Sequence, residues 1–442
     1  MREMKNSGVE WIGEFPKAWA MCKIKYILRE RNEKNEPIKS NNILSLTASQ
    51  GVIPHSEKEG GGNKPKEDLS AYKLAYPDDI VMNSMNILSG SVGLSKYYGC
   101  VSPVYYMLFS DDENINIKYY NYIFQTTVFQ KSLMGLGNGI LMKATENGKL
   151  NTIRMRIPLE KLNGLLLPIP SREEQEKIVD KLESIIPEID KIISETKASI
   201  ESYKEYKQSV ITEAVTKGLN KNVPMKKAIN SYLGVIPSDW KEKRLRFLGL
   251  CQNGISKSGE FFGTGYPFVS YGDVYKNITL PKRVNGLVET NENEREMYSV
   301  KYGDVFFTRT SETIEEVGFA STCLKTIENA VFAGFVIRFR PFNQDELLPE
   351  FSKYYFRSNI HRKFFVKEMN LVTRASLSQE LLKKLPVLLP PVTEQKEISI
   401  YLDSKCAEID KLISEKEALI TNLEEYKKSL IYEYVTGKKA VK

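Results

Sequence analysis

The chain has 442 residues, of which 41% are hydrophobic and 27% are charged, and its formal net charge is +7 at pH 7. This length exceeds one ordinary hydrophobic core and predicts two to four domains. The composition is that of a soluble globular protein, and no apolar run reaches the roughly 20 residues of a membrane-spanning helix, which excludes an integral membrane protein. Residues 1–13 lack the apolar stretch of a signal peptide, so we expect a cytoplasmic location.

The cysteines and histidines are too scattered for a disulfide framework or a metal centre. The five cysteines lie far apart and are odd in number, which indicates reduced thiols used in packing. They are Cys22, Cys100, Cys251, Cys323 and Cys406. His55 and His361 are the two histidines, and neither has a second histidine or cysteine at ligand spacing.

The two halves of the chain are copies of one unit. Residues 11–19, WIGEFPKAW, parallel residues 232–240, YLGVIPSDW, at an offset of 221. Residues 188–194, EIDKIIS, recur as residues 408–414, EIDKLIS, at an offset of 220. A fixed offset is the signature of an internal duplication, so half of the chain is one structural unit.

The first module is predicted over residues 1–166. Its run of aromatic and apolar residues at 105–109 predicts a strand, and with the run 335–339 in the second half it indicates mixed α and β structure. Between the anchors the copies keep only sparse echoes. These are Asp79-Ile80 with Asp304-Val305, and Tyr122-Ile123-Phe124 with Tyr354-Tyr355-Phe356. The two copies therefore share their anchor motifs but differ in the sequence between them. This is expected if each module reads a different target, although sequence drift would also produce it.

The first coiled-coil region is predicted over residues 167–222. It opens with the segment Leu167-Pro168-Ile169-Pro170, and its helix is predicted from Ser171 and contains Glu174-Gln175. Its apolar residues alternate at spacings of four and three, which is typical of a coiled-coil seam. The seam is Ile178, Leu182, Ile185, Ile189, Ile192, Thr196, Ser199, Tyr203, Tyr206 and Val210. Pro187 lies inside it and predicts a kink or a restarted helix.

The second module is predicted over residues 223–386 and the second coiled coil over residues 387–442. The second coil repeats Glu394-Gln395 after the prolines Pro390-Pro391. Its seam is Ile398, Leu402, Ile409, Leu412, Leu419, Leu423, Tyr426 and Leu430. We predict an α+β fold in which two globular modules of mixed α/β structure are joined by two long antiparallel coiled-coil helices in a pseudo-twofold tandem repeat. A coil of about 45 residues, at roughly 1.5 Å per residue, approaches two turns of duplex DNA.

A second apolar line makes the helical stripe wider than one seam requires. It consists of Ile186, Ile193 and Ile200 in the first helix and Ile413 and Ile420 in the second. This additional apolar surface predicts that further helical partners bind here. Alternatively, and with equal weight, these residues pack under the globular modules.

Charge separates the helices from the modules. Residues 171–217 carry a net charge of −3 and residues 391–437 carry −4, which leaves +14 for the rest of the chain, chiefly the modules. Cationic modules attract a phosphate backbone and give salt-dependent affinity, whereas a basic-zipper protein would carry its positive charge on the helix. Lysine-rich surfaces also occur without DNA binding, so charge alone leaves both interpretations open.

The sequence carries no recognisable catalytic motif. There is no phosphate-binding G-x-x-x-x-G-K-[S/T] loop, and Gly254, Gly259, Gly263 and Gly265 fit turns rather than a dinucleotide fingerprint. Leu389-Pro390-Pro391-Val392 lacks the polar and aromatic ends of the segment with which amino-methyltransferases hold a flipped base. We therefore expect a non-catalytic protein without a cofactor.

The duplicated pattern resembles the specificity subunit of type I restriction-modification systems. Each half has aromatic-x-Gly-x-x-Pro-x-x-Trp, a proline-rich exit, Glu-Gln and then Glu-Ile-Asp-Lys-x-Ile-Ser in a long helix, so the resemblance covers the whole chain. It implies two target recognition domains that each read half of a split site in double-stranded DNA, with the helices setting the spacer. It also implies two modification subunits, which methylate adenine with S-adenosylmethionine and dock on the second apolar line, and ATP-dependent restriction subunits.

Candidate DNA-binding residues follow from position. Arg154 and Arg374 lie 220 residues apart, just before each module enters its helix, and arginine often reads guanine edges, although a phosphate contact is at least as expected. Weaker candidates in polar stretches beside strand-like runs are Lys143, Arg156, Arg309, Ser270, Tyr271 and Asp273. The tryptophans, Trp11, Trp19 and Trp240, are expected in the core or at module lids.

Two other classes of function stay open at this point. A coiled-coil adaptor of protein complexes would not touch DNA, and it leaves the positive charge of the modules unexplained. A self-sufficient nuclease or methylase would need a motif that the sequence lacks.

Overall fold

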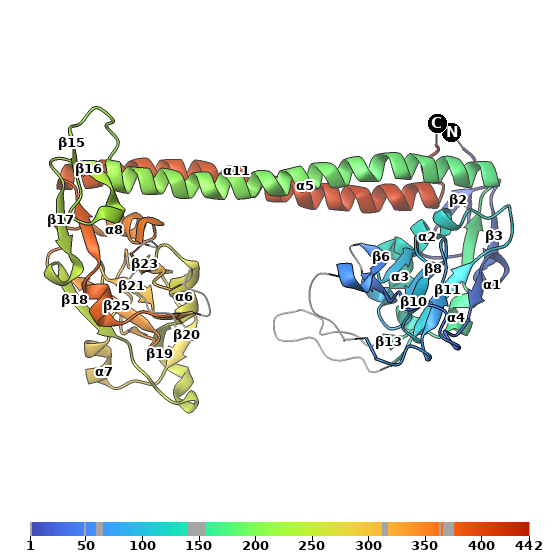
Figure 1. Cartoon of the computed structure of the whole chain (residues 1–442), viewed down its shortest axis with the longest axis horizontal. Helices are drawn as coiled ribbons and strands as arrows, with labels where there is room; N and C mark the ends of the chain where they lie inside the picture. The colour runs from blue at the N-terminus through green and yellow to red at the C-terminus, as the bar shows by residue number, and fades with distance from the viewer. Residues whose placement is uncertain are drawn as a thin grey trace. The chain divides into compact units, whose positions relative to one another are not determined.

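The computed structural model describes residues 2–47, 50–58, 65–139, 155–311, 317–361, 364–365 and 375–441. The chain divides into two compact units: unit 1 is Met1–Thr196 with Ala418–Lys442, and unit 2 is Lys197–Glu417. Each unit contains one globular module and half of each of two long helices, α5 and α11 (Figure 1). Within the described residues, no helix is long and apolar enough to cross a membrane.

Unit 1 begins with the elements of the first module. They are β1 (Met4–Asn6), β2 (Glu14–Pro16), β3 (Ala20–Lys23), α1 (Ile24–Ile27), β4 (Arg29–Arg31), β5 (Leu44–Thr47), β6 (Gly51–Pro54), η1 (His55–Glu57), β7 (Lys73–Ala75), β8 (Ile80–Asn83), η2 (Ile87–Ser89), β9 (Val92–Leu94), β10 (Gly99–Val101), β11 (Tyr105–Phe109), α2 (Ile117–Gln125), α3 (Thr127–Ser132), η3 (Met134–Leu136), β12 (Asn138–Gly139), β13 (Met155–Arg156), α4 (Leu159–Asn163) and β14 (Leu166–Ile169). The long helix α5 (Arg172–Lys217) follows and continues into unit 2.

Unit 2 contains the second module and the first part of the second long helix. Its elements are β15 (Met225–Lys227), η4 (Ser231–Leu233), β16 (Val235–Pro237), β17 (Lys241–Arg244), η5 (Leu245–Phe247), β18 (Gly249–Asn253), η6 (Gly259–Phe261), β19 (Phe262–Val269), α6 (Tyr271–Lys276), β20 (Gly286–Val288), α7 (Glu292–Met297), β21 (Val305–Thr308), β22 (Thr310–Ser311), β23 (Ala320–Thr322), β24 (Val331–Phe332), β25 (Val336–Pro341), α8 (Pro349–Tyr355), β26 (Ala375–Ser376), α10 (Gln379–Lys383), β27 (Pro386–Leu389) and α11 (Val392–Val435).

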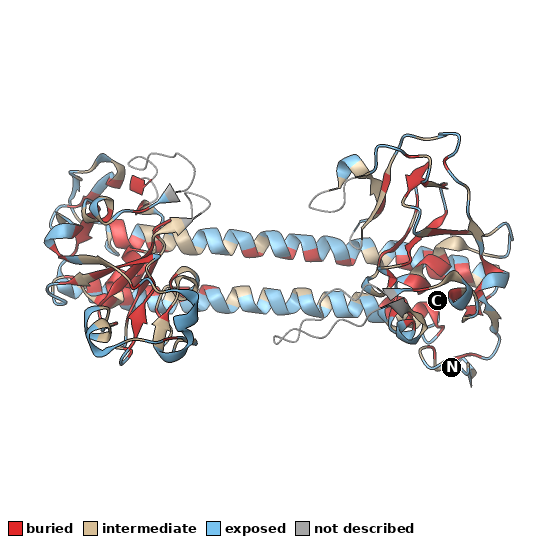
Figure 2. Cartoon of the chain, turned by 90° about the horizontal axis from the view of Figure 1, so that it is seen from below, coloured by how far each residue is buried: buried red, intermediate tan, exposed pale blue. Residues whose placement is uncertain are grey.

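A four-stranded antiparallel sheet is the frame of each module. Its strand order is β4-β11-β8-β9 in unit 1 and β18-β25-β21-β23 in unit 2. The strand predicted at 105–109 is β11, and the run 335–339 lies largely in β25. Buried residues gather between each sheet and the helices around it (Figure 2), so each module has its own core.

The echo of Asp79-Ile80 in Asp304-Val305 marks the same turn in both modules. Each aspartate is buried just before a fully buried central strand, β8 or β21. Its carboxylate accepts the backbone N–H three residues earlier, 2.9 Å from Tyr76 in unit 1 and 2.8 Å from Lys301 in unit 2. Burial raises the pKa of Asp79, and the nearby Arg31 opposes this shift.

The segment between the first sheet strand and the central strand differs between the modules. In unit 1 this segment forms the two-stranded sheet β5-β6 and supplies β7 of a second one. The partner of β7 is β10, which follows the central strand β8 in sequence. In unit 2 it forms the long strand β19, which pairs with β20 and β24, and the helices α6 and α7. The modules therefore share a frame and differ in the structure inserted into it.

The helix α5 runs through Pro187 as one element, so the predicted restart of the helix is wrong. A proline inside a helix removes one backbone hydrogen bond and costs about 3 kcal/mol. Leu182, Ile189 and Ile193 are buried in the core of unit 1 on both sides of the proline, and this burial offsets the loss.

Within each unit, a part of α5 packs antiparallel against a part of α11. The Lys427 ammonium lies 2.6 Å from the Asp190 carboxylate in unit 1, and Lys207 lies 2.6 Å from Asp410 in unit 2. Both the two lysines and the two aspartates are 220 residues apart in sequence. One contact is therefore made twice, with the roles of the two helices exchanged.

The second apolar line lies largely between the helices. Ile193 and Ile200 are buried and Ile186, Ile413 and Ile420 are half-buried, which leaves little of their surface for another protein. Four residues assigned to the seam are instead about half exposed, namely Ile192 (46%), Tyr206 (50%), Leu419 (44%) and Tyr426 (51%). The heptad pattern locates a wide apolar stripe, and the rotation of each helix in the tertiary structure decides which edge of it is covered.

A tryptophan joins both long helices to each module. In unit 1 the Trp19 indole N–H donates to Glu174 in the first turn of α5, at 2.6 Å. In unit 2 Trp240 donates in the same way to Glu394 of α11, at 2.8 Å. Both indoles are buried, which confirms the prediction of core tryptophans at these two positions. Trp11 is half-buried and meets Phe129 edge to face.

In each unit, the glycine that follows the other long helix packs against the same tryptophan. Gly437 follows α11 with φ +71°, and a Cβ there would lie 2.8 Å from the Trp19 ring and 2.5 Å from Pro16. Gly218 follows α5 with φ +74°, and a Cβ there would lie 3.4 Å from the Trp240 ring and collide with Glu394. Both positions require glycine, because the left-handed conformation and the close approach each exclude a side chain.

The glutamine next to each junction glutamate attaches the module from inside. Gln175 is buried, accepts the backbone N–H of Asn116 at 2.8 Å and donates to the carbonyls of Asn114 and Pro170. Gln395 makes the corresponding three bonds in unit 2, to Leu348, Glu346 and Pro390. The repeated Glu-Gln pair thus fixes the tryptophan and the loop before α2 or α8.

We expect Gly437→Ala to lower the stability of unit 1 by about 2–4 kcal/mol, because it adds backbone strain and a collision with Trp19. Gly8→Ala is the matched control, with φ +72° in the same unit and no atom within 4 Å of the added Cβ. The control should cost only about 1 kcal/mol. Hydrogen exchange of the β8 and β11 amides measures the stability of unit 1 in both variants. An equal loss of stability in Gly437→Ala and Gly8→Ala would contradict the role assigned to the junction.

Candidate nucleic-acid interface

In unit 2, Arg309 directly follows the central strand β21, which ends at Thr308. The Arg309 backbone N–H donates to the Phe335 carbonyl at 3.0 Å, and its carbonyl accepts from the Leu377 N–H at 2.7 Å. Across the part of the chain that the structure describes, its guanidinium has no ion-pair or hydrogen-bond partner. The backbone of this arginine is therefore held on both sides, while its charged group is available to a ligand.

Phe335 stands beside Arg309 on a tight turn between β24 and β25. Its side chain is 64% exposed. Two glycines let the turn pack against the end of β18: a Cβ on Gly254 would collide with the carbonyls of residues 332 and 333, and a Cβ on Gly334 would collide with Ser256. The turn therefore presents an aromatic ring from a closely packed backbone.

The corresponding point of unit 1 has the same backbone bond but different side chains. There the Ile157 N–H donates to the Ser84 carbonyl at 3.0 Å, as Leu377 does to Arg309. The residue before Ile157 is Arg156, which is exposed, whereas the residue before Leu377 is Ser376. In unit 1 the position of Arg309 is taken by Ser84, which is buried and donates its hydroxyl to the Val104 carbonyl at 2.7 Å, so the arginine of this site is Arg156 on the other strand. We call these two places the strand-end sites.

The remaining candidates from the sequence fall in two groups. Lys143, Arg154 and Arg374 lie outside the described residues. Ser270 and Asp273 form a capping box at the start of α6, in which the Ser270 N–H and hydroxyl both donate to the Asp273 carboxylate, at 2.8 and 2.6 Å. Tyr271 stacks on Tyr275 with ring centroids 5.9 Å apart. The polar groups of Ser270 and Asp273 thus stabilise a helix end.

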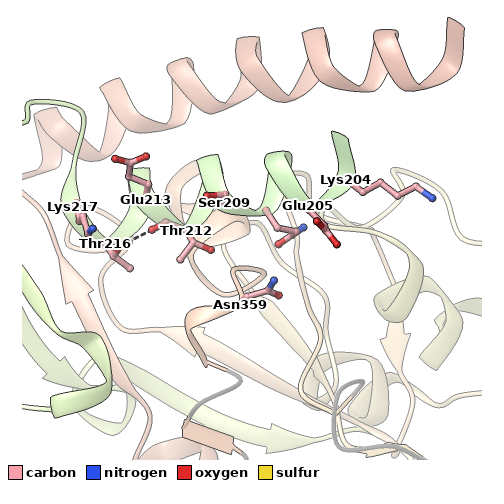
Figure 3. Close-up of a pocket in the computed structure, with 9 residues that line it drawn as sticks. Lys204, Glu205, Ser209, Thr212, Glu213, Thr216, Lys217 and Asn359 are labelled. Carbon is pink, nitrogen blue, oxygen red and sulfur yellow. Dashed lines mark hydrogen bonds between the residues drawn. The ribbon is translucent and has the colours of Figure 1, made fainter. Parts of the chain in front are cut away.

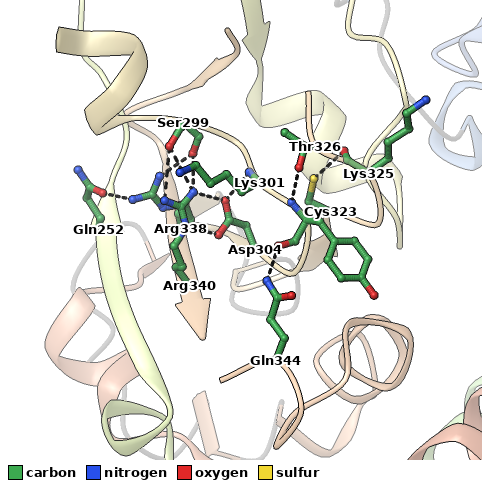
Figure 4. A network of polar contacts seen from close by, with 11 residues as sticks. Gln252, Ser299, Lys301, Asp304, Cys323, Lys325, Thr326, Arg338, Arg340 and Gln344 are labelled. Carbon is green, nitrogen blue, oxygen red and sulfur yellow. Dashed lines mark hydrogen bonds and ion pairs between the residues drawn. The ribbon is translucent and has the colours of Figure 1, made fainter. Parts of the chain in front are cut away.

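A largely buried charge network joins β25 of unit 2 to the loop before β21 (Figure 4). Arg340 donates two hydrogen bonds of 2.6 Å to the Asp304 carboxylate, and Arg338 donates to the Ser299 carbonyl at 2.6 Å. Burial, together with the adjacent Arg340, lowers the pKa of Arg338 to about 10. The network ties the inserted segment to β25. Because its two guanidinium groups bond to Asp304 and Ser299, they are not available to a ligand.

A polar hollow of about 740 Å³ lies along α5 in unit 2 (Figure 3). Its lining residues are Lys204, Glu205, Gln208, Ser209, Thr212, Glu213, Thr216, Lys217 and Asn359. Two ammonium groups and two carboxylates balance each other there, so the hollow does not favour a phosphate. Among the described residues, no group of three or more histidine, cysteine, aspartate or glutamate side chains could hold a metal ion.

Comparison with known proteins supports a recognition role. Residues 237–422 match the type I restriction modification DNA specificity domain. The chain is also 26% identical over 268 residues to the EcoKI specificity subunit of Escherichia coli K12, which is 58% of this chain and 54% of that protein. It is 24% identical over 451 residues to the putative MjaX specificity subunit of Methanocaldococcus jannaschii, which covers 98% of this chain and 96% of that one.

The chain is thus similar to type I restriction-modification specificity subunits, over residues 237–422 by the domain match and over almost its whole length by sequence.

Solved structures agree with the fold of a specificity subunit. A chain from a study of complex assembly and conformational transition of the type I restriction-modification system has a TM-score of 0.70 at 13% identity, and covers 96% of this chain and 99% of its own. The HsdS subunit from Thermoanaerobacter tengcongensis has a TM-score of 0.53 at 14% identity, with 96% and 98% coverage. The chain spans only about half of the length of the E. coli subunit that it matches, so what it binds is argued from the strand-end sites.

Removing the buried Asp304 carboxylate should destabilise unit 2 by about 3–5 kcal/mol, because the partly buried Arg340 loses its ion pair and the buried Arg338 loses a nearby counter-charge. The variant is Asp304→Ala, and hydrogen exchange of the β21 and β25 amides measures the loss. Glu380→Ala breaks the exposed Glu380–Lys383 pair instead and should leave the stability of unit 2 nearly unchanged, because solvent screens this pair. A similarly small effect of Asp304→Ala would show that the network does not hold the module together.

Proposed function

We propose that this chain is the sequence-specific DNA-binding subunit of a type I restriction-modification complex. Each module reads one part of a two-part target in double-stranded DNA, and partner subunits carry out adenine methylation and restriction. One observation carries the proposal: the strand-end sites share one backbone hydrogen bond, and the arginine at that bond is Arg156 in one module and Arg309, on the other strand, in the second module. A shared frame with exchanged side chains suits two readers of different sequences.

The chemistry of these side chains supports DNA as the ligand. Arginine donates two hydrogen bonds to the O6 and N7 atoms of guanine and also binds phosphate. Outside the two helical segments the chain carries a net charge of +14, which would draw a duplex to the modules and away from the acidic helices. An adaptor without DNA binding gives no reason for this distribution.

The helices are proposed to fix the spacing of the two target parts and to bind the partners. The repeated lysine–aspartate contact between α5 and α11 supports a pseudo-twofold arrangement. The exposed apolar edge at Ile192, Tyr206, Leu419 and Tyr426 supports docking of further helices, since it repeats at heptad spacing. The subunit itself is proposed to be non-catalytic, with the modification subunits supplying methyl transfer and the restriction subunits supplying cleavage.

Methylation mapping tests this function. The chain is co-expressed with its modification subunit, random DNA is methylated, and modified adenines are located by sequencing. We expect a split motif with a constant spacer that appears only when both proteins are present. Methylation by this chain alone, or methylation by the pair without any sequence motif, would contradict the proposal.

Arg309→Ala should relax one part of the split motif and leave the other part unchanged, because the arginine belongs to one module. Binding to the original target should weaken by about 1–3 kcal/mol if the arginine contacts a base. If it contacts phosphate, affinity should fall about equally on all sequences, and the slope of log affinity against log salt should decrease by about one.

Arg156→Ala provides the corresponding test in unit 1 and should alter the other part of the motif. Lys325→Ala is the control in unit 2, since this lysine is exposed and belongs to the segment between β23 and β24 rather than to either strand of the strand-end site. Unchanged motif and affinity in both arginine variants would remove these residues from the interface.

A further inference from the structure

A short helical turn follows the strand that leaves each tryptophan junction. In unit 1 it is α1, whose first N–H, from Ile24, donates to the Leu165 carbonyl at 2.9 Å. In unit 2 it is η5, whose first N–H, from Leu245, donates to the Leu385 carbonyl at 2.8 Å. Ile24 and Leu245 are fully buried. The two turns are therefore the same element, fixed by the same bond.

Each turn exposes an aromatic ring that lies against a cation. Tyr26 is 70% exposed, and the Lys25 ammonium lies 4.8 Å from its ring centroid. Phe247 is 62% exposed, and the Arg246 guanidinium lies 5.1 Å from its ring centroid. A second cation, Lys23 or Arg244, precedes each turn and is also exposed. We call the sets Lys23, Lys25, Tyr26 and Arg244, Arg246, Phe247 the turn patches.

The side chains of the turn patches keep their chemical class in both copies, while exposed neighbours do not. At the same offset of 221, Lys17 corresponds to Ser238, Ala18 to Asp239, and Ala20 to Lys241, and all six residues are exposed. Packing explains why the buried positions stay apolar, but it places no constraint on a ring that is mostly in solvent. A shared role on the surface explains why cation, cation and aromatic are retained.

The role of the turn patches must be the same in both modules, whereas recognition of the DNA target differs between them. We propose that each turn patch binds one copy of the same protein, the modification subunit, through an apolar socket with an acidic rim. The proposal rests on the proposed function, which supplies the partner, and it assigns one partner copy to each module. Within the described residues, none of the four patch cations forms an ion pair, so their charge remains available to an acidic surface.

A protein surface fits the patches better than a duplex. The backbone of a duplex offers phosphates to the cations, but it offers no apolar cavity to an aromatic ring on a convex turn. Aromatic and arginine side chains are the residues that most often anchor protein interfaces, where the ring enters a pocket and the charges lie at its rim. Because both copies retain an aromatic ring, a protein surface is favoured over a duplex as the ligand of the turn patches.

The test uses the full chain and its modification subunit at fixed salt, with complex mass and titration measuring how many copies bind and how tightly. Tyr26→Ala and Phe247→Ala should each weaken the binding of one of the two copies by about tenfold or more, and the double variant should weaken both. Tyr26→Phe, which keeps the ring, should bind as the unchanged chain does. Because both rings are mostly exposed, the thermal unfolding of each variant should match that of the original.

Phe335→Ala is the control, since this ring is 64% exposed in unit 2 but belongs to the strand-end site. It should change DNA target preference and leave partner assembly unchanged, whereas the turn-patch variants should do the reverse. Normal assembly by the double variant would overturn the proposal, and loss of DNA affinity with normal assembly would assign the patches to the duplex. If the unchanged complex showed no sequence-specific methylation, the proposed function would fail, independently of the patches.

Discussion

The structure depends on the indole hydrogen bond that joins each module to the helices. Trp19 donates to the first turn of α5 and packs against the glycine that follows α11, while Trp240 donates to the first turn of α11 and packs against the glycine that follows α5. The start of one helix and the end of the other are thus fixed on one buried ring in each unit. This constraint places both helices at the same side of a module core and lets the rest of the module surface vary.

Variation at a fixed backbone is the property that a recognition protein needs. The central strand, the turn before it and the bond to residue 157 or 377 are common to both modules. On that frame the arginine comes from β13 in one module and from the end of β21 in the other. Arg156 and Ser376 are exposed and can vary without loss of the fold, whereas Ser84 is buried and bonded to the Val104 carbonyl.

The surface of this chain has two kinds of functional candidate, which the internal duplication distinguishes. The strand-end sites differ between the copies, as suits two different DNA sequences. The turn patches are alike in the copies, as suits one partner that binds twice. Buried positions are alike for a different reason, since Trp19 and Trp240 or Gln175 and Gln395 are retained by their hydrogen bonds and packing.

Local periodicity and motifs at a fixed offset predict the duplication, the two long helices and the core tryptophans at positions 19 and 240 from the sequence alone. The tertiary structure was needed to show that α5 passes through Pro187, that the line containing Ile193 and Ile200 is covered, and that Ser270 and Asp273 cap a helix. It also placed Phe335 beside Arg309. Each of these outcomes depends on which distant residues pack together, and the free energy of that packing is not encoded in any local pattern.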